Sequence, residues 1–229
     1  MVERLRVGYE PDFAPLTFVE DGTARGMIVD ILNRVFDRSG CVVDFVPVAL
    51  PDQDEAVRAG EVDAIAFKAA IPERAAGYDF STPLAASGAA WFGQAEIPSD
   101  GRPAPGTRLA TPGAGPLLAD LRRRYPDIVY IDVDTYAQAL AAVVDGAADC
   151  AALNFHVGCY LAVRDHAGLF ALPEAPFQKL PLALAFAKGA HACLLGQLNA
   201  GLSELREDGT LSEVESRWTG LRGPRPLQQ

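Results

Sequence analysis

Two kinds of apolar periodicity alternate along this chain, and their alternation restricts the possible fold more than any other feature of the sequence. Short apolar runs typical of buried strands are followed by segments with apolar residues every three or four positions, as on one face of a helix. The first such run is expected at 5–9, and the first helix covers 27–36 and ends near Gly40. Repeated strand–helix–strand units indicate an α/β protein whose sheets are mainly parallel.

The alternation stops near residue 93 and then resumes, which indicates two lobes with a sheet each. Before the break, the expected elements are strands at 42–46, 64–67 and 86–92, an extended segment at 79–83, a helix at 52–59 and a helical turn at Pro72. After it, they are strands at 108–111, 128–133, 150–154 and 182–186 and helices at 117–125, 136–144, 157–163, 194–205 and 211–218. The Pro- and Gly-rich stretch 94–106 is expected to be a loop, and the tail GPRPLQQ to be disordered.

Charge and hydropathy exclude two classes of partner. The formal net charge is -10 and the sequence pI about 4.7, so the chain repels nucleic acid and anionic membrane surfaces. The short basic run Arg122–Arg124 is interpreted as a solvated helix face. No apolar run approaches the roughly 18 residues that a membrane-spanning helix needs.

The cysteines and histidines do not form a metal-binding pattern. Cys41, Cys150, Cys159 and Cys193 show no CxxC spacing and lie among apolar neighbours. We expect buried free thiols, and one disulfide in an oxidising compartment stays open. The three histidines have no ligand spacing with a cysteine, so no metal and no cofactor is expected.

Four stretches resemble the type 2 periplasmic solute-binding proteins that serve polar amino-acid uptake. They are LRVGYEPDFAPLTFVEDGTARGMIVDIL near the start, AIPERAAGYDFSTPL, DGAADCAALN, and the closing segment from LALAFAKGAHACLL to ESRWTG. The resemblance covers nearly the whole chain in the right order. The "ER…DFSTP" stretch and the "LREDGTL…W" ending are its more specific parts.

The resemblance implies a periplasmic-binding-protein-like II fold of two lobes. Lobe 1 would be residues 1–89 plus 187–229, and lobe 2 would be 90–186, with the ligand cleft between them. Two crossing strands, near 89–92 and 182–186, would form the hinge. The resemblance also implies a monomer that delivers its ligand to the membrane permease of an ABC transporter. The chain begins MVERLRVGYE without a signal peptide, so we expect a periplasmic protein that has lost its targeting segment, or a cytoplasmic one.

Five candidate ligand-binding residues are expected in lobe 1. Arg74 matches the arginine that clamps the ligand carboxylate in the family, because a guanidinium fork fits a carboxylate with two parallel hydrogen bonds. Phe13 matches an aromatic residue that covers the ligand, and Glu10 matches an acidic position that alternatively only sets loop geometry. Phe67 is a candidate apolar wall and Lys68 a candidate second positive charge. The alternatives are an exposed arginine on a turn, a core phenylalanine and a surface lysine.

The other candidates are expected in lobe 2. The TPGAGP segment, with Thr111, Gly113, Ala114 and Gly115, would offer N–H groups at a helix start, or else is a plain tight turn. Asn154 stands where the family usually places an aspartate that pairs with the α-ammonium of the ligand. His156 follows it and either faces the cleft or is a surface histidine at a helix start.

The departure at Asn154 lowers the expectation of an ordinary α-amino acid, because an unpaired ammonium in a closed cleft is costly. Ala69 and Ile71 also replace hydroxyl residues of the family. The pattern favours a carboxylate with an apolar part against the phenylalanines. Two rival functions stay open: the ligand-sensing domain of a receptor kinase, and a dehydratase on the same fold. The dehydratase would need a cleft acid, for which the sequence offers Glu10 or His156, so we expect a binding protein without catalytic residues.

Overall fold

The computed structural model describes residues 4–95, 97, 101, 103–113 and 116–220, and within these the chain forms two compact units. Unit 1 contains the described residues up to 86 together with 180–218. Unit 2 contains those of 87–179 together with Thr219 and Gly220. The proline-rich tail and part of the 94–106 loop lie outside the described residues. The two units are described separately below.

The sheet of unit 1 has the order β12–β6–β1–β5, and β7 pairs with β12. Its strands are β1 (Arg4–Tyr9), β5 (Val42–Pro47), β6 (Ala64–Ala69), β7 (Tyr78–Phe80) and β12 (Gln178–Ala187). β1 is parallel to β5 and β6, whereas β12 is antiparallel to β6 and β7. The expected strand–helix–strand units are therefore parallel, and the strand that returns from the second unit runs in the opposite direction.

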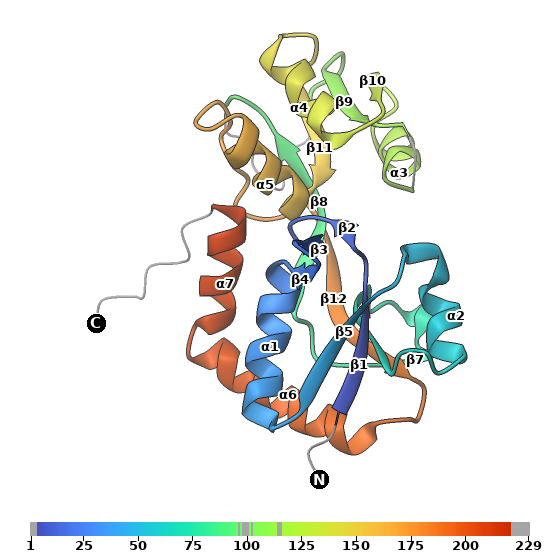
Figure 1. The fold of residues 1–229 in the computed structure, drawn as a ribbon. Helices are drawn as coiled ribbons and strands as arrows, with labels where there is room; N and C mark the ends of the chain where they lie inside the picture. Colours follow the sequence, from blue (N-terminus) through green and yellow to red (C-terminus); the bar gives the residue numbers. More distant parts are fainter. Residues whose placement is uncertain (1–3, 96, 98–100, 102, 114–115, 221–229) are drawn as a thin grey trace. The chain divides into compact units, whose positions relative to one another are not determined.

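Helices cover both faces of this sheet (Figure 1). On one side lie α1 (Met27–Ser39), α6 (Ala192–Glu207) and α7 (Thr210–Thr219), whose apolar residues join those of β1 in the larger core. On the other side, α2 (Gln53–Arg58) packs with β7 in a smaller core. The turns η1 (Leu50–Asp52) and η2 (Pro72–Arg74) lie beside α2 and before β7. The helix expected from residue 27 ends as predicted, at a left-handed Gly40.

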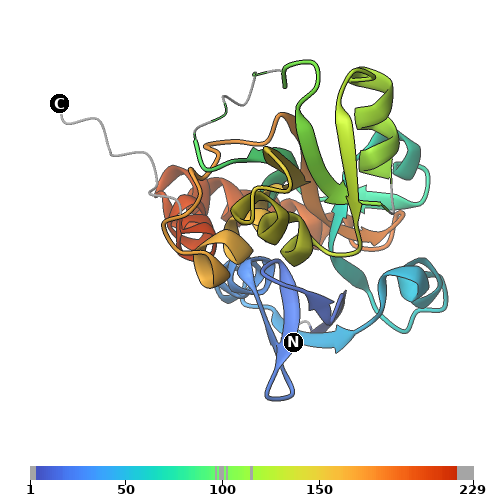
Figure 2. The same cartoon turned by 90° about the horizontal axis from the view of Figure 1, so that it is seen from above.

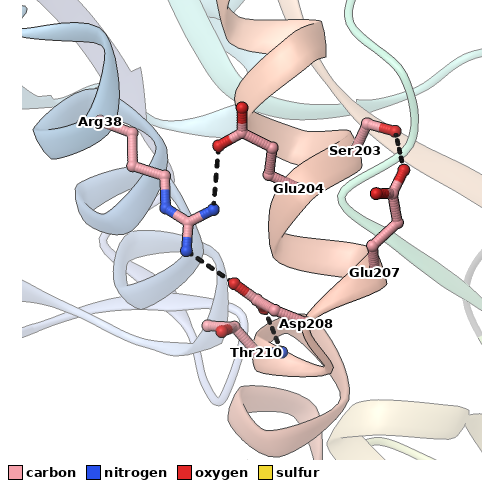
Figure 3. A network of polar contacts seen from close by, with 6 residues as sticks. All are labelled: Arg38, Ser203, Glu204, Glu207, Asp208 and Thr210. Atoms are coloured by element: carbon pink, nitrogen blue, oxygen red, sulfur yellow. Dashed lines mark hydrogen bonds and ion pairs between the residues drawn. The ribbon is translucent and has the colours of Figure 1, made fainter.

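Arg38 joins the C-terminal ends of two helices of unit 1 (Figure 3). Its guanidinium on α1 lies 3.2 Å from Glu204 and 2.7 Å from Asp208 at the end of α6. Asp208 also accepts the main-chain N–H of Thr210, which starts α7. The side-chain hydrogen bond of Thr210, followed by that of Arg38 and by the main-chain N–H of Thr210, lowers the pKa of Asp208 to about 2. Asp208 therefore connects α6, α7 and α1 at one point.

A three-stranded antiparallel sheet follows β1, in a stretch for which the sequence analysis predicted no strands. It consists of β2 (Asp12–Phe13), β3 (Thr17–Glu20) and β4 (Thr23–Arg25). Runs of two to four residues are too short to show a period-two pattern, so sequence reasoning missed them. The sheet holds Phe13 at its first strand and thereby shapes the segment that carries two candidate site residues.

The part of the nine-stranded sheet that lies in unit 2 has the order β10–β9–β11–β8, and helices flank it (Figures 1 and 2). Its elements are β8 (Ala85–Phe92), β9 (Arg108–Pro112), α3 (Pro116–Arg124), β10 (Val129–Val133), α4 (Tyr136–Val144), β11 (Cys150–Asn154) and α5 (Phe155–Asp165). β9 is parallel to β10 and β11, and β8 is antiparallel to β11. Thr135 caps α4, and Gln138 completes a capping box.

The unit boundaries fall inside β8 and β12, which are the two strands expected to cross between lobes. The first boundary lies after residue 86 and the second after residue 179, whereas we placed them after 89 and 186. Leu182, Leu184 and Phe186 belong to the core of unit 1. This explains why the second boundary lies earlier in the chain than we predicted. Apolar runs show that a strand is buried but not which of two cores buries it.

Within the described residues, no helix combines the length and apolar character that crossing a membrane requires. All four cysteines are free thiols. Cys150 and Cys159 are buried as expected, Cys41 is half-buried, and Cys193 is exposed. Burial raises the pKa of the Cys150 thiol to about 12.

Candidate functional site

Glu10 organises the loop after β1. One of its carboxylate oxygens accepts the main-chain N–H of Asp12 at 3.3 Å, and the other accepts that of Leu50 at 2.5 Å. The hydroxyl of the buried Thr17 donates to the carbonyl of Glu10 at 2.8 Å. The side chain is nearly buried, with 9% of the residue exposed. Glu10 thus connects the loop that precedes Phe13 to the turn after β5, which is the loop-setting role that we left open.

Phe13 and Phe67 form an aromatic pair. Their ring centroids are 6.1 Å apart and the planes differ by 23°, so the rings are stacked. Both are partly buried and pack against the larger core of unit 1. β2 supplies Phe13 and β6 supplies Phe67, so residues distant in sequence meet here. The pair provides one apolar surface at the end of β6.

Arg74 lies in the turn η2 and is exposed. Its guanidinium donates one hydrogen bond, at 3.3 Å, to the carbonyl of Ala69 at the end of β6. No carboxylate among the described residues lies within ion-pairing distance of it. Phe67 is two residues before Ala69 in β6, which corresponds to roughly 7 Å along a strand. A guanidinium without an anionic partner is therefore tethered near the aromatic pair.

Lys68 contacts Asp54 and Tyr78 and thereby forms a cluster separate from the aromatic pair. Its ammonium lies 2.7 Å from a carboxylate oxygen of Asp54 on α2 and 5.4 Å from the centre of the Tyr78 ring. Only 10% of the Lys68 side chain is exposed, so the alternative of a surface lysine is wrong. The phenol of Tyr78 donates to the same carboxylate at 2.5 Å. The positive charge of Lys68 is thus compensated within unit 1.

The contacts between Lys68, Asp54 and Tyr78 shift the pKa values of the Asp54 carboxyl and the Tyr78 phenol. The hydrogen bond from Lys68, followed by that from Tyr78, lowers the pKa of Asp54, and the charge of Arg74 contributes in the same direction. Burial, followed by the hydrogen bond to Asp54, raises the pKa of the Tyr78 phenol. At neutral pH Asp54 is therefore a carboxylate and Tyr78 a neutral phenol.

Asn154 caps α5 in unit 2. Its side-chain oxygen accepts the N–H groups of His156 at 3.1 Å and Val157 at 3.2 Å, which are typical N-cap bonds. Its amide nitrogen donates to the hydroxyl of Ser87 at 3.0 Å. The residue itself is half-buried. The pattern predicted that β11 ends at this residue, and the structure confirms it.

His156 is completely buried, so the alternative of a surface histidine is wrong. Its Nδ1 lies 3.1 Å from the hydroxyl of Ser87, and its ring meets that of Phe155 edge to face. Ser87 itself is only 2% exposed. Ser87, near the start of β8, therefore contacts both Asn154, the N-cap of α5, and His156 in the first turn of that helix.

The structure describes only part of the TPGAGP segment. Thr111 is fully buried and donates its hydroxyl to the carbonyl of Ala152 at 2.9 Å, which fixes β9 to β11. The N–H of Gly113 donates to the carbonyl of Val133 at 2.9 Å. Ala114 and Gly115 lie outside the described residues. The hydrogen bonds of Thr111 and Gly113 thus connect neighbouring strands of the sheet.

Sequence reasoning missed two polar residues, Ser87 and Asp54. Ser87 stands in an otherwise small and apolar run, and Asp54 is one of several acidic residues in 52–61. Neither position carries a motif, since their partners Asn154, His156 and Lys68 come from other elements. A polar residue within an apolar strand is the one signal that singles out Ser87.

Comparison with known proteins gives consistent matches over nearly the whole chain. A probable amino-acid ABC transporter-binding protein of Haemophilus influenzae is 29% identical over 225 residues, covering 94% of this chain and 84% of that protein. The fold is similar to the unliganded, open L-cystine solute receptor of Neisseria gonorrhoeae, with a TM-score of 0.80 at 23% identity and 95% and 93% of the two chains covered. It is also similar to substrate-binding domain 2 of Lactococcus lactis GlnP, with a TM-score of 0.78 at 17% identity and 96% and 97% coverage.

The two structural matches show the type 2, two-lobed fold that we expected from the sequence. The sequence profile of the bacterial extracellular solute-binding proteins, family 3, matches residues 5–221. This chain therefore belongs to the family 3 extracellular solute-binding proteins of bacteria.

Proposed function

We propose that the protein is the solute-binding receptor of an ABC-type uptake system and that it binds a small carboxylate-bearing metabolite through Arg74. One observation carries the proposal: the Arg74 guanidinium has no anionic partner among the described residues, although a hydrogen bond holds it at the end of β6. A planar fork of donors is suited to a carboxylate, which accepts two parallel hydrogen bonds. The Phe13–Phe67 stack offers an apolar surface nearby.

In this proposal each lobe supplies part of the ligand contacts. Lobe 1 contributes Arg74 and the aromatic pair, and lobe 2 contributes Asn154. A ligand that touches both lobes binds a closed state better and shifts the population toward it. The boundaries inside β8 and β12 are where such a hinge motion would occur. Our expectation of a periplasmic monomer that delivers its ligand to a membrane permease is part of this proposal, and family membership supports it.

We favour a binding protein over the dehydratase. A dehydratase needs an acid that delivers a proton to a leaving hydroxyl. Both oxygens of Glu10 accept main-chain N–H groups, and His156 is completely buried beside Ser87. The two acids that the sequence offered are thus engaged in maintaining the fold. Turnover of prephenate or arogenate by the purified protein would contradict this preference.

A thermal-shift screen tests the receptor proposal. The panel contains carboxylates, amino acids and uncharged solutes, with each compound added to wild type, Arg74→Ala and Arg4→Ala. A ligand at one hundred times its Kd should stabilise the protein by about 2.7 kcal/mol. Arg74→Ala should lose the shift. Arg4→Ala is the control, because Arg4 is the first residue of β1 and 70% of its side chain is exposed. This variant should keep the shift. Silence across the panel would contradict the proposal and favour a sensor domain.

A further inference from the structure

Two donors converge on one oxygen of Asp54 in unit 1. The Lys68 ammonium lies 2.7 Å from Oδ1, and the Tyr78 phenol donates to the same atom at 2.5 Å. A carboxylate oxygen has two lone pairs, so Oδ1 is saturated. Oδ2 accepts no hydrogen bond from the described residues, and 61% of the Asp54 side chain is exposed. The carboxylate thus retains one oxygen that can bind a further cation.

Arg74 lies beside this carboxylate. Its guanidinium donates at 3.3 Å to the carbonyl of Ala69, which is the residue after Lys68 in β6. The pKa of Asp54 is lowered first by the hydrogen bond from Lys68 and, to a smaller extent, by the charge of Arg74. The guanidinium is therefore within electrostatic reach of the carboxylate, although the two are not within ion-pairing distance.

An ion pair between Arg74 and Asp54 would compete with any external anion. Both residues are exposed, so their side chains have room to move toward each other. A guanidinium fork matches a carboxylate with two parallel hydrogen bonds, and such a pair would occupy two donors of Arg74. The charge of Lys68 opposes this pairing, because it compensates the carboxylate and repels the guanidinium.

We propose that Lys68 is a positioning residue, which holds Asp54 and thereby keeps the Arg74 guanidinium accessible to an external anion. The inference rests on the proposed function in one respect, since the ligand of that proposal would be the anion. The second cation that the sequence predicted thus acts without touching the ligand. Its low exposure, 10% of the side chain, agrees with such an internal role.

Arginine labelling in the absence of any ligand tests the inference. Phenylglyoxal condenses with accessible guanidinium groups, and peptide mass spectrometry measures the rate at each arginine. Arg6 is the internal reference, because its guanidinium donates to both oxygens of Asp63, at 3.3 and 2.8 Å. Lys68→Met should slow the labelling of Arg74 relative to Arg6 by about two- to fivefold, which is the factor that an exposed ion pair contributes.

Lys68→Met/Asp54→Asn is the matched variant. It removes the competing carboxylate together with the lysine, so Arg74 should be labelled at the wild-type rate. Lys68→Arg keeps a cation at this position and should also keep that rate. A loss of structure would accelerate the labelling of Arg6 as well, whereas the proposed pairing slows Arg74 alone. Should Lys68→Met not fold, Lys68→Gln serves for the same measurement, because it removes the charge but keeps a donor for Asp54.

The outcomes separate this inference from the proposed function. Labelling of Arg74 that stays the same or becomes faster in Lys68→Met would overturn the inference, and so would slowing that persists in the double variant. The receptor proposal would then depend on the thermal-shift screen alone. Slower labelling in Lys68→Met together with silence in that screen would support the role of Lys68 and overturn the receptor proposal.

Discussion

The Lys68 ammonium lies 2.7 Å from a carboxylate oxygen of Asp54, and 90% of the lysine side chain is shielded from solvent. Lys68 is adjacent in sequence to Phe67, whose ring stacks on Phe13. Two consecutive residues of β6 therefore serve different purposes. Phe67 adds to the candidate ligand surface, and Lys68 connects β6 to α2 and β7.

Asp54→Asn should destabilise the protein by about 1–3 kcal/mol, because the largely buried Lys68 loses its anionic partner. Asp54→Asn/Lys68→Met removes both charges and should be less destabilising than the single change. Chemical unfolding of both variants checks this. Asp52→Asn is the control, since the neighbouring Asp52 side chain caps nothing. A double variant less stable than Asp54→Asn would contradict the account.

The same pair predicts a dependence of stability on pH in acid. The pKa of Asp54 is lowered in the folded protein, chiefly by Lys68. A carboxylate with a depressed folded pKa contributes stability above its unfolded pKa of about 3.9, and this is lost as pH falls through the folded value. The difference in melting temperature between wild type and Asp54→Asn should therefore be largest near pH 7 and shrink below pH 4. A constant difference would show that the pair is not the cause.

Gly88 should tolerate no side chain. Its φ is +134°, and an ideal Cβ would lie 1.6 Å from the carbonyl oxygen of Gln178. Gly88→Ala should thus separate β8 from this segment and cost several kcal/mol, at the upper end for single substitutions. Gly196→Ala is the matched control, because a Cβ there meets nothing within 4 Å inside α6, and it should stabilise by about 0.5–1 kcal/mol. Thermal unfolding of both variants measures the contrast.

Thiol labelling at pH 8 should distinguish the cysteines. Cys193 is exposed and should react first. Burial holds the pKa of Cys150 at about 12, so its thiol stays protonated and should react only when the protein unfolds. Cys159, also buried, should behave like Cys150. Rapid labelling of three or more cysteines in the native protein would contradict the described burial.

The sequence by itself determined the order of most long elements and the family. α1, α4 and α6 repeat apolar residues at helical spacing, and β1, β6 and β11 are apolar runs bounded by turns, so local patterns sufficed. The family resemblance also supplied the candidate residues Arg74 and Asn154. The strands β2 to β4 were missed because they are too short to show a period.

Only the tertiary structure decided what the polar side chains do. From the sequence alone, a lysine at the end of a strand shows the same pattern whether its side chain points to solvent or to Asp54. The position at which α2 packs decides between the two. The sequence likewise predicts Asn154 as a neutral ligand-binding residue. In the structure its side-chain oxygen accepts main-chain N–H groups, because Asn154 is the N-cap of α5. Hydrogen-bond partners lie up to 69 residues apart in this cluster, and no local pattern encodes such distant pairings.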